Sequence, residues 1–177
     1  MRDMWHQAQR QLSLCRIVID GTVLSTLLGS QVLAIVWYNA EILYDDYPPA
    51  VRAQARPMSA RAKREQRIAR PPFLLTMFGG MLVSTLGLKW QNGGQLSFLA
   101  AFLHIYAVFV FFNAFDLVVM DWLVLLGLKP AFAKLPGADD WEPYMDYRFH
   151  FDAFLKGLVI GLLPSLLLAW GASRRWR

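Results

Sequence analysis

The feature that most constrains the fold of this chain is an apolar run of 31 residues, 98–128, whose second half carries Asn113, Asp116 and Asp121. A straight α-helix of that length, at about 1.5 Å per residue, is longer than the roughly 30 Å hydrocarbon core of a bilayer. The run therefore predicts a membrane-spanning helix that tilts strongly or projects beyond the membrane. A carboxylate facing hydrocarbon costs at least about 2.5–3.5 kcal/mol, so we expect other helices to supply partners for these acids.

Three further apolar runs accompany this one, and charged residues lie mainly between the runs. The predicted spans are residues 17–44, 72–89, 97–128 and 149–171. This pattern predicts an all-α polytopic membrane protein, with residues 1–177 forming one domain of four transmembrane helices in an up-down bundle whose third helix is over-long. Proline pairs mark two boundaries, 48–49 after the first span and 71–72 in the first turn of the second, and Pro164 is expected to bend the fourth span.

The composition fits a membrane protein better than a soluble one. The chain is 56% hydrophobic with a net charge of +5, and the apolar residues are gathered into long runs. In a soluble protein this charge would suggest a nucleic-acid partner; basic segments beside membrane spans explain it more simply, so we expect no nucleic acid to bind. Cys15 is the only cysteine, so no intrachain disulfide forms.

A basic segment, residues 50–70, separates the first two spans. It contains Glu65 as its only acid and the basic residues Arg52, Arg56, Arg61, Lys63, Arg64, Arg67 and Arg70. We interpret it as a solvated loop that sets the orientation of the protein, with a short helix possible within residues 59–68; the alternative is a patch for anionic lipid or an acidic partner. The positive-inside rule then predicts that loops 45–70 and 129–148 are cytoplasmic in a bacterial-type inner membrane.

Polar residues of the first span form a stripe along one side of the predicted helix. At 100° per residue the stripe falls within a sector of about 80°. Its members are Asp20, Gln31, Tyr38, Glu41 and Asp45. We expect this stripe to face protein and not lipid.

The alternating direction of the spans places one group of polar residues at the same membrane face, where the first and third spans end and the fourth begins. This predicted cluster consists of Asn39, Glu41, Asp45, Asp46, Asn113, Asp116, Asp121, His150, Asp152 and Lys156. With α-helical geometry Asp121 points about 140° away from Asp116. Lys156 is the best cation for a deeply placed Asp116, so we predict an ion pair between these two side chains.

The histidines do not predict a metal site. His104 lies well away from Asp116 along the third span, and we expect it to form a hydrogen bond between helices. His150 lies beside carboxylates, but one histidine among scattered acids lacks the spacing of metal ligands. No catalytic motif is present in the sequence, which leaves open whether the protein is an enzyme.

Three functions fit these observations. The first is an accessory or assembly subunit of a larger membrane complex, bound to a membrane-protein partner or to further copies of itself; it explains the lack of motifs. The second is a small oligomeric transporter or channel that uses the acids for a proton or cation. The third is an intramembrane enzyme or binding protein for a lipid-like substrate, with Glu41 or Asp116 transferring a proton. Four helices leave little room for a sealed pathway, which places the first function ahead.

Overall fold

In the computed structural model, which describes residues 2–174, the chain is all-helical. The helices are α1 (Arg2–Gln11), α2 (Leu14–Asn39), η1 (Ala40–Asp46), α3 (Pro49–Gln54), α4 (Ala60–Gln91), α5 (Phe98–Phe115), η2 (Asp116–Leu128), η3 (Ala131–Ala133), η4 (Glu142–Tyr144), α6 (Tyr147–Ile160) and α7 (Leu162–Ser173). Four helical segments are long and apolar enough to cross a membrane: Leu14–Asp46, Ala60–Gln91, Phe98–Leu128 and Glu142–Ser173. Met1 and residues 175–177, which include two arginines of the basic C-terminus, lie outside the described residues.

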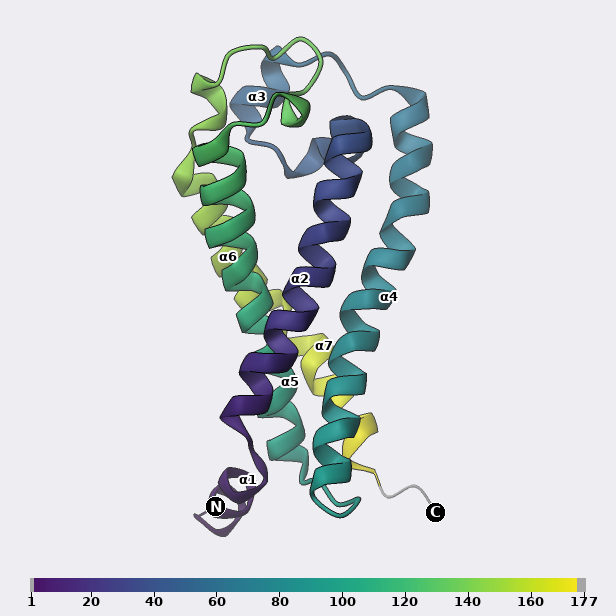
Figure 1. Cartoon of the computed structure of the whole chain (residues 1–177), viewed down its shortest axis with the longest axis vertical. Coiled ribbons are helices and arrows are strands. Elements are labelled where there is room, and N and C mark those ends of the chain that lie inside the picture. Colours follow the sequence, from purple (N-terminus) through teal and green to yellow (C-terminus); the bar gives the residue numbers. More distant parts are fainter. Residues whose placement is uncertain (1, 175–177) are drawn as a thin grey trace.

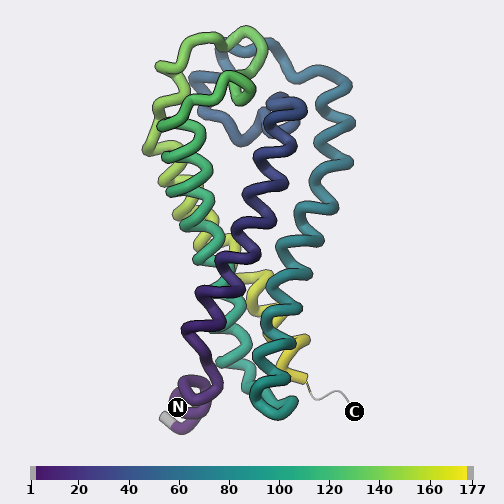
Figure 2. Tube along the Cα trace, in the orientation of Figure 1, coloured from purple at the N-terminus to yellow at the C-terminus, as the bar shows by residue number. Residues whose placement is uncertain are grey.

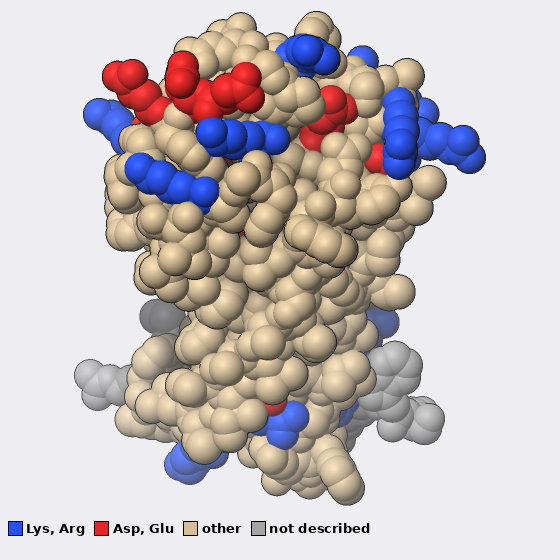
Figure 3. All heavy atoms as spheres, turned by 45° about the horizontal axis from the view of Figure 1, so that its top comes forward, with Lys and Arg blue, Asp and Glu red and all other residues tan. Residues whose placement is uncertain are grey.

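The long helices run side by side in alternating directions (Figure 1). One end of the molecule, the terminal end, carries α1, the turn between α4 and α5, and the end of α7. The opposite end, the loop end, carries residues 45–59 and 129–146. The helices lie close together at the terminal end and diverge towards the loop end (Figure 2). Charged side chains gather at the two ends, most of them over the loop end, and the surface between is nearly free of them on the face seen in Figure 3.

The polar stripe of the first span faces protein, as predicted, and its partners lie on α4 or are the residue that caps it. Asp20 accepts a hydrogen bond from Ser84 at 2.5 Å, and Gln31 donates one to Thr76 at 2.8 Å. Nearer the loop end, the remaining stripe residues contact the first third of α4 or the residue that caps it. These pairs are Tyr38 with Glu65, Glu41 with Ser59, and Asp45 with Gln66 and Arg70. The stripe therefore joins α2 and η1 to α4 along most of their length.

The second long helix begins earlier than its prolines suggest. Ser59 caps α4 by accepting a hydrogen bond from the backbone N–H of Ala62, so residues 60–70 are helical and Pro71 and Pro72 lie inside the helix. The short helix expected within residues 59–68 is present as the first part of α4, whereas the prediction that Pro71 and Pro72 open a separate helix is wrong. A proline removes one intrahelical hydrogen bond and cannot unfold a helix that neighbouring contacts hold on both sides. The basic side chains of residues 61–70 consequently project from a rigid helix.

The third long segment changes its hydrogen bonding halfway. Asp116–Leu128 is a π-helix of 13 residues, with i→i+5 hydrogen bonds such as the one from the N–H of Lys129 to the carbonyl of Val124, 3.2 Å long. Most π-helical elements are single turns and they occur frequently at functional sites, so a run of this length is unusual. Wider turns also make the segment shorter than a straight α-helix of 31 residues. Lys129 ends it in the left-handed conformation, with φ of 49°.

The fourth segment consists of two helices that meet at Gly161. Pro164 lacks the N–H that would bond to the carbonyl of Ile160, and the helix is interrupted there. Glycine at two positions allows close approach to α5: a Cβ on Gly157 would lie 2.6 Å from Asn113 Oδ1, and one on Gly161 would fall on the ring of Phe109. The predicted bend and these two glycines therefore bring α6 and α7 against α5.

Candidate functional site

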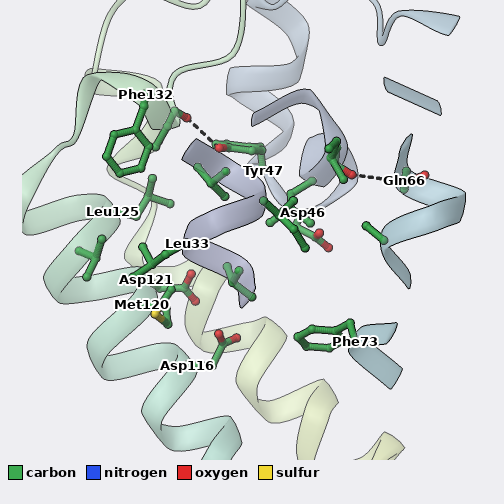
Figure 4. A pocket seen from close by; sticks show the side chains of 18 of the residues that line it. Leu33, Asp46, Tyr47, Gln66, Phe73, Asp116, Met120, Asp121, Leu125 and Phe132 are labelled. Atoms are coloured by element: carbon green, nitrogen blue, oxygen red, sulfur yellow. Dashed lines mark hydrogen bonds between the residues drawn. The ribbon is translucent and has the colours of Figure 1, made fainter. Parts of the chain in front are cut away.

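A cavity of about 500 Å³ opens where the helices diverge at the loop end. It lies between the C-terminal part of α2, η1, the middle of α4, and η2, with the connection after η2 closing one side (Figure 4). Most of its wall is apolar, and the apolar residues include Val32, Leu33, Val36, Phe73, Leu74, Phe112, Met120, Val124, Leu125 and Phe132. A space of this volume and character is typical of a site for a small, mostly hydrocarbon molecule.

Four ionisable groups of the predicted cluster line this cavity: Asp46, Asp116, Asp121 and His150. In Figure 4 Asp116 and Asp121 project from the same helix, and Asp46 lies across from them. The π-helix explains why Asp116 and Asp121 share a side, since residues five apart are hydrogen-bonded neighbours in that geometry. The prediction that Asp121 points away from Asp116 is therefore wrong, because it assumed α-helical turns.

Asp121 is held by His150. The distance from His150 Nδ1 to Asp121 Oδ2 is 3.0 Å, and His150 is 3% exposed. The Nε2 atom of His150 is buried and has no hydrogen-bond partner among the described residues. The pair joins the beginning of α6 to η2 and fixes both side chains at the cavity wall.

Asp46 and Asp116 differ from Asp121 because neither has a hydrogen-bond or ion-pair partner in residues 2–174. Arg70 also lines the cavity, but its guanidinium pairs with Asp45 at 3.5 Å. Asp116, which is half-buried, and Asp46, which is exposed, thus line a mainly apolar space without a protein cation bound to them. A half-buried carboxylate such as Asp116 is costly to keep among apolar residues without a partner.

The predicted ion pair between Asp116 and Lys156 is not formed. Lys156 is exposed on α6 and does not line the cavity. Its neighbour Gly157 is the residue that faces α5, where Asn113 packs against it. Successive residues of an α-helix point about 100° apart, so Lys156 is turned away from the interface that Gly157 enters. The prediction of this pair is wrong for that reason.

The other predicted residues have structural contacts outside the cavity. Asn39 donates to Glu65 at 2.9 Å, Glu41 accepts from the Ser59 hydroxyl at 2.5 Å, and Asp45 bonds Gln66 and Arg70. Asn113 donates to the carbonyl of Phe154 at 2.9 Å. Asp152 faces solvent and lies 3.8 Å from Arg148, not from Lys156. Asn39, Glu41, Asp45 and Asn113 thus join neighbouring segments, whereas Asp152 pairs within α6. None of the five lines the cavity.

Sequence reasoning missed Tyr47, which lines the cavity and is 4% exposed. Its hydroxyl donates to the carbonyl of Ala133 at 2.7 Å, and burial raises the pKa of this phenol above its ordinary value. Tyr47 also packs edge-to-face on the buried Tyr144, with ring centroids 5.8 Å apart. Tyrosines near the ends of apolar runs usually anchor at the membrane interface, and nothing in the sequence separates these two from that class.

The connection after η2 forms a compact cap over the cavity end of the molecule. Leu135 donates its N–H to the hydroxyl of Tyr144 at 2.8 Å, and that hydroxyl donates to the carbonyl of Ala138 at 3.0 Å. A small apolar core joins the connection to α3 through Val51, which is fully buried. The cap fixes Phe132 and Ala133 at the cavity wall.

The described part of the chain contains no group of three or more His, Cys, Asp or Glu side chains that could hold a metal ion. Comparison with known proteins adds no family: no family model matches the chain, nor does any curated protein or solved structure. The character of the site therefore rests on its geometry, namely an apolar cavity with two unpartnered carboxylates on its wall.

Proposed function

We propose that this is an integral membrane protein, a four-helix up-down bundle that binds a lipid-like amphiphile in the cavity at its loop end. The observation that carries the proposal is the pair Asp46 and Asp116, which face an apolar space of about 500 Å³ without partners. A ligand with a hydrocarbon body and a hydrogen-bond-donating or cationic head matches both features. Its body would contact the apolar wall and its head the carboxylates.

The cavity changes the order of the functions that the sequence suggests. An accessory subunit needs surfaces for its partner, and it does not need an internal space with ionisable groups. A proton or cation transporter needs a polar path to both ends, whereas the core between the cavity and the terminal end is mainly apolar and includes Leu28, Met81 and Ile105. A binding protein, or an enzyme that uses Asp116 to transfer a proton to such a ligand, makes use of the cavity as it stands.

The same proposal places the loop end on the cytoplasmic side of a bacterial-type inner membrane. The belt of uncharged surface between the two ends supports insertion (Figure 3). The basic residues of α4 between positions 61 and 70 support this orientation, since cytoplasmic segments carry an excess of Lys and Arg.

Binding can be tested with three ligands that share one hydrocarbon chain: decylamine, decanol and decanoate, added to the protein in lipid nanodiscs. A ligand that binds only the folded state raises the unfolding temperature. We expect the amine to stabilise most and the carboxylate least, because Asp46 and Asp116 repel an anionic head. Asp116→Leu should remove the preference for the amine, and Val124→Phe, which fills the cavity, should weaken all three ligands.

The matched control is Asp20→Asn, which changes an acid at the opposite end and should leave the order of the three ligands intact. Equal stabilisation by amine and carboxylate in the wild type would contradict the proposal, as would an amine preference that survives both cavity variants. Mass spectrometry of molecules that remain bound after gentle extraction would then identify the natural ligand.

A further inference from the structure

A second hollow lies on the outside of the molecule, between the C-terminal part of α2 and the N-terminal half of α4. This α2–α4 groove has a volume of about 700 Å³. It is lined by Ala34, Ile35, Tyr38, Ile42, Arg61, Arg64, Glu65, Ile68, Ala69 and Pro72. Its polar residues lie near the loop end and its apolar residues nearer the middle of the molecule, because α4 runs in that direction (Figure 1).

The polar part of the groove carries a net positive charge. Glu65, the only acid between residues 50 and 70, receives hydrogen bonds from Arg61 at 2.8 Å, Tyr38 at 3.0 Å and Asn39 at 2.9 Å. Its charge is thereby matched by Arg61, whose guanidinium also donates to the Tyr38 hydroxyl. Arg64 is exposed in the groove and has no ion-pair or hydrogen-bond partner in the described part of the chain.

We propose that the α2–α4 groove binds an anionic phospholipid. Arg64 would contact the phosphate, because a guanidinium donates two parallel hydrogen bonds to phosphate oxygens. One acyl chain would lie along Ala34, Ile68 and Pro72, away from the loop end. Basic pockets between membrane helices on the cytoplasmic side are typical sites for anionic lipid headgroups.

The groove and the cavity share part of one wall. Ile35, Ile42 and Ala69 line both of them. A lipid in the groove would therefore pack against the outer side of the wall that separates the cavity from the bilayer. The lipid site rests on the proposed membrane insertion, and it does not depend on what the cavity binds.

Native mass spectrometry of the purified protein tests the site, with phosphatidylglycerol and phosphatidylcholine of identical chains as competing probes. The wild type should retain phosphatidylglycerol in preference. In Arg64→Gln we expect its affinity to fall by about tenfold, as the loss of a charge-assisted hydrogen bond implies. Lys63→Gln is the matched control: it removes one positive charge from the neighbouring, exposed position outside the groove and should keep the affinity within about twofold of the wild type.

Two further arms separate lipid binding from simple charge attraction. Ala34→Phe fills the apolar part of the groove at a position that does not line the cavity, and it should weaken phosphatidylglycerol without changing the charge. Glycerol phosphate, the headgroup without chains, should bind far more weakly than the lipid. Equal losses in Arg64→Gln and Lys63→Gln, or no loss in either, would overturn the proposal, and so would glycerol phosphate binding as tightly as the lipid. The decylamine preference should survive Arg64→Gln, so failure here is distinguishable from failure of the cavity proposal.

Discussion

The two ends of the molecule differ in whether their acidic side chains have hydrogen-bond or ion-pair partners. At the terminal end, Asp20 lies 3.0 Å from Arg16 and accepts the hydroxyl hydrogen of Ser84, while His104 Nε2 lies 2.7 Å from the same hydroxyl. Because Ser84 gives its only hydrogen to Asp20, its oxygen accepts the Nε2 hydrogen of His104. At the loop end, Asp46 and Asp116 face a cavity and have no partner in residues 2–174.

The difference follows from how closely the helices approach. At the terminal end, His104, Leu28 and Ala101 are fully buried, and Gly21 lies so near Phe111 that an added Cβ would be 2.7 Å from the ring. Lys89 is also satisfied there, since its ammonium donates to the carbonyls of Ala172 and Arg174 at the end of α7. Polar groups in the packed end connect helices, and unpartnered acids in the open end are available to a ligand.

The largest expected effect comes from overfilling the packed end. Gly161→Leu would place a side chain on the ring of Phe109, and we expect the free energy of unfolding to fall by about 3 kcal/mol. The measurement is reversible unfolding of the protein in mixed micelles. Gly79→Ala is the control, since nothing lies within 4 Å of a Cβ at that position. A tolerated Gly161→Leu would mean that the packing of α5 on α7 is looser than described.

The next effect tests the hydrogen bonds that join Asp20, Ser84 and His104 at the terminal end. Ser84→Ala leaves the Nε2 hydrogen of His104 without an acceptor and removes a donor from Asp20, so we expect a loss of about 1–2 kcal/mol. Ser25→Ala is a matched control, because Ser25 is equally buried and its hydroxyl has no hydrogen-bond partner among the described residues. That variant should be neutral or slightly stabilising. If both variants lost the same free energy of unfolding, the hydrogen bonds of Ser84 to Asp20 and His104 would contribute nothing specific to stability.

At the loop end, removing a polar side chain should raise the free energy of unfolding and not lower it. Asp116→Leu removes an unpartnered carboxylate from a mainly apolar site, so we expect the free energy of unfolding to rise by about 1 kcal/mol. The preference for decylamine should disappear in the same variant. Unfolding measured without and with the amine separates the two effects. A less stable Asp116→Leu would place Asp116 among the structural acids, beside Asp20.

The sequence predicted that the polar stripe of the first span faces protein, and it predicted neither the partners of that stripe nor the arrangement of the acids in the third span. Residues of α2 follow the regular 100° step, so the stripe from Asp20 to Asp45 could be derived, whereas its partners on α4 could not. The hydrogen bond between helices that was expected for His104 is present, with Ser84 of α4 as its partner. In η2 the hydrogen bonds change to i→i+5, which brings Asp116 and Asp121 together, and no residue pattern in the run indicates that change.

The smallest expected effect tests the corrected position of Lys156. If Asp116 faces the cavity alone, Lys156→Gln should change the free energy of unfolding by less than about 0.5 kcal/mol, the usual range for a surface substitution. It should also leave the order of decylamine, decanol and decanoate unchanged. A Lys156 paired with Asp116 would instead leave that acid uncompensated when removed, and Lys156→Gln would then both destabilise the protein and strengthen its binding of decylamine. The two measurements together decide whether the open end of the molecule holds a free carboxylate or one half of an ion pair.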